Sequence, residues 1–321
     1  MNDVLRSLLG RMRANVIAYD VYVVIVMAVY CILAIVYYPS VPGALAVLQQ
    51  DIIIAIAIVA LVLVWTITEH GLFGMLRRFY VIPVVYLMYD QVHVFVRAVH
   101  PIDYDNLLIE ADRWLFGTDP TVWLAQWSFP ALTEYLQVCY FLFYLLPIMH
   151  AVELWRRHDM DRLDTFARAM TFCYFISYLA YFVMPAIGPR FTIHDFSLIN
   201  TDLPGLLFTP VLRDLIDVGG GIGRGVVDPA LVVNRDCMPS GHTWLTLVNI
   251  ILGFRFRSKF RWVFFLIGGS LIFSTVYLRY HYVVDVIVGA LLAVVTLRLE
   301  PSVNAAIRKW LTGDVTVDKS R

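Results

Sequence analysis

The chain has 321 residues, of which 60% are hydrophobic and 16% are charged. Soluble domains carry roughly 45–50% apolar and about 25% charged residues, so this composition excludes a soluble domain and predicts an integral membrane protein. The 25 basic and 25 acidic residues balance, so the net charge indicates neither a nucleic acid nor an acidic partner.

Eight apolar segments follow one another along the chain, and a helix of about 20 such residues crosses a bilayer. They predict an all-α, polytopic membrane bundle of about eight spans. The segments are residues 17–38, 52–68, 81–99, 132–153, 169–187, 242–254, 262–280 and 282–299. The first segment is longer than the apolar core of a signal peptide, which has about 7–15 residues, so we interpret it as a retained span.

Basic residues alternate between the connections of these segments. They gather at the N-terminus and after the second, fourth, sixth and eighth segments, whereas connection 39–51 has none and 100–131 has only Arg113. By the positive-inside rule, both termini are predicted to be cytoplasmic. The loop 187–241 and residue 281 then lie on the extracytoplasmic side, and the membrane that we expect is the plasma (inner) membrane.

Two histidines lie where polar loops meet apolar segments on this outer side. In the stretch CMPSGHTWLTLV (237–248), Ser240 is a natural N-cap, and a helix N-terminus offers free N–H groups to an anion. His242 beside such an anion pocket could protonate a departing alkoxide. His281 and Asp285 are four residues apart and are predicted to share a helix face. The carboxylate could fix the imidazole tautomer and leave the other ring nitrogen as a nucleophile.

Two arginines could add positive charge on the same side. Arg190 ends the stretch PAIGPR, and Arg279 lies two residues before His281. The forked guanidinium of arginine suits phosphate oxygens. A single arginine or histidine at a membrane interface is commonly only an anchor. Because the four side chains converge on one side, we predict a site for an anionic substrate.

The third apolar segment carries three ionisable residues on one predicted helix face. Asp90, His93 and Arg97 are spaced i, i+3 and i+7. Ionisable residues inside a membrane commonly face the bundle interior and serve a function. Two interpretations stay open, namely a buried ion pair that fixes helix packing and a path that admits a polar headgroup.

Two further features predict no site. The stretch GGGIGRG (219–225) lacks the GK[ST] ending of a phosphate-binding loop and does not follow a strand, so we interpret it as a flexible hinge. Of the four cysteines, Cys237 alone lies in a loop, and no CxxC or Cys/His spacing is present. We therefore expect neither a metal site nor a disulfide framework.

The two histidine stretches resemble the motifs of the type 2 phosphatidic acid phosphatase superfamily. Its PSGH motif is present whole as residues 239–242. Its SRxxxxxHxxxD motif is matched by Ser274, His281 and Asp285. The core region of the superfamily corresponds to about residues 165–299.

This resemblance implies a role for each motif residue. His281 would be the nucleophile that forms a phosphohistidine, and Asp285 would orient it. His242 would act as the general acid and then as the general base. Ser240 and the N–H of Gly241 would bind phosphate oxygens. We expect no metal or other cofactor, because positive side chains and a helix end can neutralise the phosphoryl charge.

Two departures from the superfamily pattern point to one of its branches. Thr275 stands where the third motif has arginine, and Arg279 is our candidate to replace that arginine. In the first motif, Arg190 follows a proline instead of preceding one. These features, the opening of the third motif at residues 274–278 and the stretch ADRWLFGTDPTVWLAQW (111–127) resemble the branch that includes inositol phosphorylceramide synthases.

Together these observations predict a membrane-embedded enzyme that acts on a lipid phosphate or phosphodiester. The branch resemblance favours transfer to a polyol or other alcohol, and plain hydrolysis stays open as an alternative. A transporter or binding protein for anionic lipids is an alternative of another class. The lipid and the oligomeric state do not follow from the sequence.

The predicted organisation has three parts. Residues 1–164 form N-terminal membrane helices with an external segment at 100–131. Residues 165–299 form the catalytic helical core with its external loop 187–241, and residues 300–321 form a cytoplasmic tail.

Overall fold

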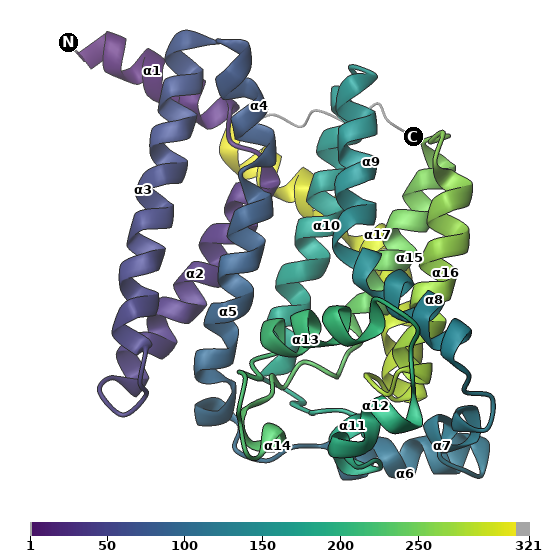
Figure 1. Cartoon of the computed structure of the whole chain (residues 1–321). Coiled ribbons are helices and arrows are strands. Elements are labelled where there is room, and N and C mark those ends of the chain that lie inside the picture. The colour runs from purple at the N-terminus through teal and green to yellow at the C-terminus, as the bar shows by residue number, and fades with distance from the viewer. Residues whose placement is uncertain (1, 313–321) are drawn as a thin grey trace. The chain divides into compact units, whose positions relative to one another are not determined.

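The structure is a computed structural model that describes residues 2–312 (Figure 1). Within this range the chain forms helices and loops and no strand, so the predicted all-α fold is confirmed. The predicted tail lies partly outside the described residues, at 313–321.

The described helices belong to two compact units that alternate along the chain. The first unit holds the described residues of Met1–Ala98, Ala167–Leu179 and Val295–Arg321. The second unit holds Val99–Phe166 and Ala180–Val294. These units describe compactness. The predicted boundary at residue 164 separates N-terminal membrane helices from a catalytic core, and this functional division stays a prediction.

The first unit is built from long apolar helices. They are α1 (Asn2–Ala14), α2 (Ala18–Tyr37), α3 (Ala44–Thr68), α4 (Gly71–Phe79) and α5 (Val81–Val99), with the middle of α10 (Met160–Tyr181) and the end of α17 (Val283–Thr312). Inside this unit Arg77 pairs with Asp20, and Arg168 pairs with Glu300 at 3.0 Å. Pairing is expected because a single charge in an apolar interior is costly.

The second unit carries the motif residues. Its helices are α6 (Asp105–Phe116), α7 (Pro120–Ala125), α8 (Pro130–Phe141), η1 (Leu142–Tyr144), α9 (Leu145–Arg156), α11 (Pro189–Thr192), η2 (Phe196–Leu198), α12 (Ile199–Asp202), α13 (Thr209–Gly219), α14 (Pro229–Val232), α15 (Gly241–Arg255) and α16 (Arg261–Tyr277), with the start of α17. Helix α16 packs against both α15 and α8.

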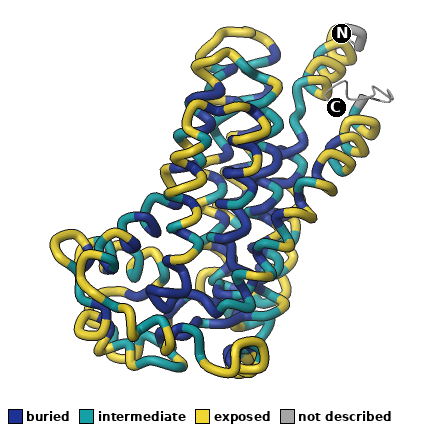
Figure 2. The backbone as a smooth tube through the Cα atoms, turned by 90° about the vertical axis from the view of Figure 1, so that its right-hand side faces the viewer, coloured by how far each residue is buried: buried dark blue, intermediate teal, exposed yellow. Residues whose placement is uncertain are grey.

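The eight predicted segments fall mainly on helical residues, of which 132–153 covers α8, η1 and α9 in succession, and the count of eight spans stays a prediction. Four helical stretches are long and apolar enough to cross a membrane, namely Ala18–Tyr37, Ala44–Thr68, Gly71–Val99 and Pro130–Arg156. Helix α16 is apolar but shorter. Along the long helices, each turn carries both buried and exposed residues (Figure 2), which is the pattern of helices with one side in a core and one side in lipid.

Two helix ends differ from the predicted segments. Helix α10 ends at Tyr181, whereas the apolar segment continues to residue 187, because Pro185 and Gly188 disfavour further helix. Helix α17 continues through Pro301 to Thr312, whereas the segment was predicted to end at 299. Hydropathy identifies only the part of a helix that is apolar enough for a membrane. The alanines and long side chains after residue 299 still favour a helix, so α17 continues.

Candidate functional site

The second unit brings His242, His281 and Asp285 into contact. The Nδ1 atom of His281 lies 3.2 Å from Oδ1 of Asp285 and 3.0 Å from the carbonyl oxygen of Cys237. The Cys237 carbonyl oxygen can only accept, so Nδ1 carries the proton and donates to it beside the Asp285 carboxylate, and in the neutral ring Nε2 keeps its lone pair. Nε2 lies 3.2 Å from Nδ1 of His242. The arrangement aims a potential nucleophile at a second imidazole.

The Asp285 carboxylate is itself held by two further donors. Its Oδ2 accepts from the backbone N–H of Tyr282 at 3.0 Å and from the thiol of Cys237 at 2.9 Å. The side chain is fully buried. Cys237 had no predicted role, because it lies 48 residues from Asp285 and no local spacing connects the two. The carboxylate is therefore fixed before any substrate arrives.

Burial and charge act in opposite directions on His281. Burial disfavours the imidazolium, but the Asp285 carboxylate favours it, and the balance raises the pKa of His281 above its ordinary value. Burial also raises the pKa of the Cys237 thiol, and the Asp285 charge adds to this effect. The thiol therefore keeps its proton and acts as a donor.

A carboxylate on α6 fixes the start of α17, next to His281. Asp112 on α6 accepts from the N–H groups of Val283 and Val284 at 2.9 and 2.8 Å, which fixes the start of α17. His281 consequently lies two residues before α17, not on its face as the sequence predicts. Its contact with Asp285 forms across the first turn.

A second carboxylate on the same side of α6 holds the loop that precedes Arg190. Asp105 accepts from the N–H groups of Ile187 and Gly188 at 3.0 and 2.8 Å, and from the hydroxyl of Tyr282 at 2.8 Å. Sequence reasoning missed Asp105 and Asp112. Their i, i+7 spacing in an amphipathic segment was the signal that could have found them.

The imidazole of His242 lies between aromatic rings. Tyr140 of α8 stacks on it with ring centroids 4.6 Å apart, and Phe143 lies at 4.4 Å. The His242 side chain is half-buried. As predicted, α15 begins with Ser240 as its N-cap, whose side chain accepts from the N–H of Thr243.

The predicted phosphate ligand Ser240 and the motif position Thr275 are engaged in local structure. The Ser240 hydroxyl donates to Thr243 Oγ1 at 3.1 Å, and its own backbone N–H donates to the Asp285 carbonyl oxygen at 3.3 Å. Thr275, at the position of the missing arginine, offers its carbonyl oxygen to the N–H groups of Tyr280 and His281. Gly241 is buried at the start of α15. These contacts position the histidine stretches.

The two predicted arginines lie together and are each paired with a carboxylate. The Arg190 N–H donates to the Arg279 carbonyl oxygen at 3.0 Å. The Arg190 guanidinium lies 4.7 Å from the Tyr280 ring and pairs with Asp217. Arg279 pairs with Asp202 at 2.8 Å. Both arginine side chains are buried, and both carboxylates come from the loop 187–241.

A glycine permits this close packing. Gly188 has φ +95°, and a Cβ there would lie 2.6 Å from the Tyr280 carbonyl oxygen. Only glycine therefore lets the turn before Arg190 lie against the residues before His281.

A third arginine, missed by the sequence analysis, belongs to the same region. Arg213 of α13 is buried and donates to the carbonyl oxygens of Ile199 and Leu203 at 3.3 and 3.2 Å. Burial lowers the pKa of Arg213, and the charges of Arg190 and Arg279 act in the same direction. Three guanidinium groups therefore share one electrostatic neighbourhood.

The site also contains one group of side chains with metal-ligand chemistry. Donor atoms of Cys237, His281 and Asp285 lie within 4.8 Å of one another. Protons on the thiol and on Nδ1 already link these atoms, so an ion would have to replace both. The observed contacts suit an oriented imidazole.

The ionisable residues of the third predicted span lie in the first unit, on α5. Asp90 and Arg97 are exposed and His93 is half-buried. The His93 ring lies 4.6 Å from that of Tyr89. Both interpretations of this trio stay predictions.

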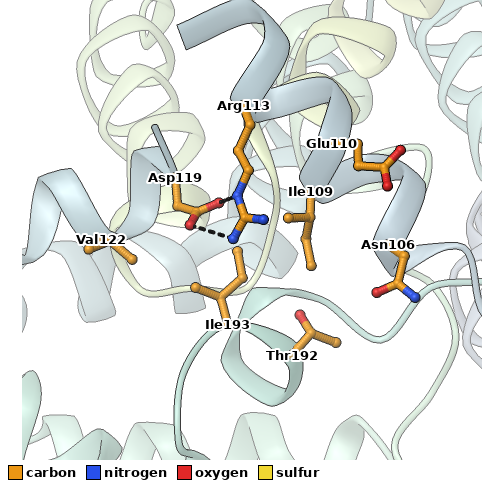
Figure 3. A pocket seen from close by; sticks show the side chains of 8 residues that line it. All are labelled: Asn106, Ile109, Glu110, Arg113, Asp119, Val122, Thr192 and Ile193. Atoms are coloured by element: carbon orange, nitrogen blue, oxygen red, sulfur yellow. Dashed lines mark hydrogen bonds and ion pairs between the residues drawn. The ribbon is translucent and has the colours of Figure 1, made fainter. Parts of the chain in front are cut away.

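A separate polar pocket of about 460 Å³ lies between α6, α7 and α11 (Figure 3). It is lined by Asn106, Ile109, Glu110, Arg113, Asp119, Val122, Thr192 and Ile193. Arg113 donates twice to Asp119, at 2.8 and 2.9 Å. None of the predicted site residues lines this pocket. Helix α6 thus shows one side to the histidine site and another to the pocket.

We expect Cys237→Ala to slow turnover about tenfold, because one hydrogen bond that orients Asp285 is lost. Without the hydrogen bond from the thiol, the charge of Asp285 acts more strongly on the imidazolium of His281 and raises its pKa further. The acid limb of the pH profile of kcat/KM should therefore move to higher pH. Cys237→Ser keeps a donor and should restore both quantities toward the parent values. Steady-state kinetics across pH test this. A Cys237→Ala enzyme with the parent rate and profile would show that the thiol has no positioning role.

The fold and the site define a helical membrane protein with an aspartate-held histidine facing a second histidine. The PAP2 superfamily model matches residues 106–299, more than half of the chain. The chain therefore belongs to the PAP2 superfamily, which confirms the resemblance at the level of the superfamily.

One curated relative is a PA-phosphatase related-family protein of Dictyostelium discoideum. It is 26% identical over 171 residues, which are 48% of this chain and 29% of that protein. The chain thus matches less than a third of the length of this relative. No solved structure is significantly similar to the chain.

Proposed function

We propose that the protein is a membrane-embedded phosphotransferase or phosphatase for lipid phosphates or phosphodiesters, working through a phosphohistidine on His281. The observation that carries the proposal is the orientation of His281, with Nδ1 held by Asp285 and Nε2 facing His242. Superfamily membership supports this chemistry.

The reaction proceeds in two displacements. His281 Nε2 attacks phosphorus, the bond from phosphorus to the leaving oxygen breaks, and protonated His242 gives its proton to that oxygen. His242 then takes a proton from water or an alcohol, whose oxygen attacks phosphorus as the bond to Nε2 breaks. Because the two ring nitrogens lie 3.2 Å apart, the phosphoryl group must separate the imidazoles when it enters.

The arginines neutralise the phosphoryl oxygens in this proposal. Arg190 and Arg279 are paired with Asp217 and Asp202, so phosphoryl oxygens would replace these carboxylates when substrate binds. Together with the helix N-terminus at Gly241, these cations supply electrostatic stabilisation without a metal.

We expect Asp217→Asn to lower KM for a lipid phosphate about two- to tenfold, because the neutral amide competes less well than a carboxylate for Arg190. Inhibition by inorganic phosphate should strengthen to a similar degree. The kinetics are measured beside the thermal unfolding midpoint, and Asp228→Asn in the same external loop is the control. A higher KM with an unchanged midpoint would show that Asp217 positions Arg190 for substrate.

The pH dependence follows from the pKa of His281. The nucleophile must be neutral, and its pKa is raised above an ordinary value of about 6.5. We therefore expect kcat/KM to fall as the pH drops through that raised pKa, and to fall again at higher pH as His242 loses the proton that it gives to the leaving oxygen. The measurement should use a phosphodiester lipid, because the charge of a phosphodiester stays constant over this pH range. An acid limb below about pH 6 would contradict the assignment.

Transfer to a polyol or other alcohol, as in the inositol phosphorylceramide synthase-like branch, is the form of the reaction that we favour. The sequence features of that branch support it, and hydrolysis is the alternative outcome. The test is mass spectrometry of lipid products from purified protein in the presence of a chelator, with and without inositol-type acceptors. A new phospho-alcohol indicates transfer, whereas free phosphate from a phosphomonoester, or a phosphate monoester from a phosphodiester, indicates hydrolysis. A chain that binds anionic lipids but forms no product that depends on His281 would instead be a binding protein or transporter.

A further inference from the structure

Helix α13 is amphipathic, and its two sides meet different surroundings. Val211, Leu215 and Val218 are spaced for one side of this helix, and each is more than half exposed, as is Leu207 in the turn before it. On the opposite side, Arg213 is buried. Phe208 and Leu206, in the turn before the helix, are also exposed. An apolar surface of this kind needs an apolar environment.

The depth of α13 is set by a contact with a membrane-spanning stretch. Glu134 is the fifth residue of the candidate span Pro130–Arg156, which places it about 6 Å along the helix from its start. Its carboxylate accepts from four consecutive backbone N–H groups, at residues 206–209, and from the Thr209 hydroxyl. The N-terminus of α13 is thereby fixed level with the first turns of the span.

The orientation of α13 agrees with a position in one leaflet. In Figure 1, α13 runs across the direction followed by α9 and α16 of the same unit. Next to Glu134, Tyr135 is exposed on the outside of α8. An exposed aromatic ring of the span thus lies beside the residue that holds the N-terminus of α13.

We infer that the Leu206–Val218 segment is an interfacial element embedded among the acyl chains of the leaflet in which α8 begins. Its partner is a lipid surface, in the manner of amphipathic helices that lie in the plane of the interface. Its inner side carries Asp217, which pairs with Arg190. If the proposed function holds, a headgroup in that leaflet lies beside the arginines, so α13 borders the route of the lipid.

Spin labels in phosphatidylcholine vesicles test this placement without any measurement of activity. A label on Val211→Cys should collide often with oxygen and rarely with a water-soluble nickel chelate. A matched label on Arg224→Cys, in the exposed loop after α13, should show the reverse. The parent chain, labelled in parallel, gives the background from native cysteines. Leu215→Cys provides a second position on the apolar side.

Equal access of the nickel chelate to positions 211, 215 and 224 would overturn the inference, whatever the enzyme does. A kinetic arm adds a readout of function. Val211→Asp should raise KM for a long-chain lipid in vesicles at least severalfold, and should leave KM for a short-chain, water-soluble substrate unchanged. Val227→Asp, at an exposed loop position, is the control. Equal effects on both substrates would also count against lipid embedding.

Discussion

His281→Asn should reduce turnover of a lipid phosphate by about 10⁴-fold or more, the scale seen when an enzyme loses its nucleophile. Asparagine can occupy the space of the imidazole, and its side chain offers no lone pair that can form a phosphoramidate at neutral pH. Binding of the lipid should change little, because the cations of the site remain. Product formation and lipid binding are measured on the same preparation.

The control for this variant is His100→Asn, in the same unit but outside the histidine site. Its imidazole contacts the Tyr104 hydroxyl at 3.0 Å, and its loss should leave turnover near the parent value. If His281→Asn keeps more than about a tenth of the parent rate, another group is the nucleophile.

Asp285→Asn should cost on the order of 10²–10⁴ in turnover, because the imidazole loses its fixed tautomer. The carboxylate accepts from the Tyr282 N–H and the Cys237 thiol, and its other oxygen faces Nδ1 of His281. An amide has only one accepting oxygen. Whichever way it turns, its NH₂ group meets a donor, and an NH₂ group facing Nδ1 would compete with the Cys237 carbonyl oxygen and favour the tautomer with the proton on Nε2.

The Asp285→Asn enzyme should also lose the raised pKa of His281, so the acid limb of kcat/KM should move to lower pH. Asp236→Asn, one residue before Cys237, is a matched control for removal of one negative charge nearby. A rate loss without any movement of the acid limb would assign Asp285 a purely structural role.

The sequence predicted those features that local rules determine. Hydropathy located the helices, and the N-cap preference located the start of α15 at Ser240. The spacing of four residues correctly predicted contact between His281 and Asp285, although His281 lies before α17. Such features depend on a few neighbouring residues, so a sequence pattern can represent them.

The rest of the site depends on contacts between distant segments. Asp112 fixes the start of α17 from 171 residues away, and Cys237 reaches Asp285 across 48 residues. Arg213 lies near the other arginines through its contacts with Ile199 and Leu203 and through Glu134, which holds the N-terminus of α13. The hydroxyl of Ser240 contacts Thr243, and its predicted role in binding phosphate stays a prediction. The i, i+7 spacing of Asp105 and Asp112 marks one side of a helix, but no periodicity or spacing says which distant segment such a side chain contacts.

The most direct test of the central claim is to trap the phosphorylated protein. A lipid substrate labelled with ³²P is mixed with purified protein and chelator and quenched in alkali, where phosphohistidine survives, and the label is mapped by digestion. We expect label on His281 of the parent chain and none on His281→Asn. Turnover without any label on His281, or label that persists in His281→Asn, would contradict a phosphohistidine at this residue.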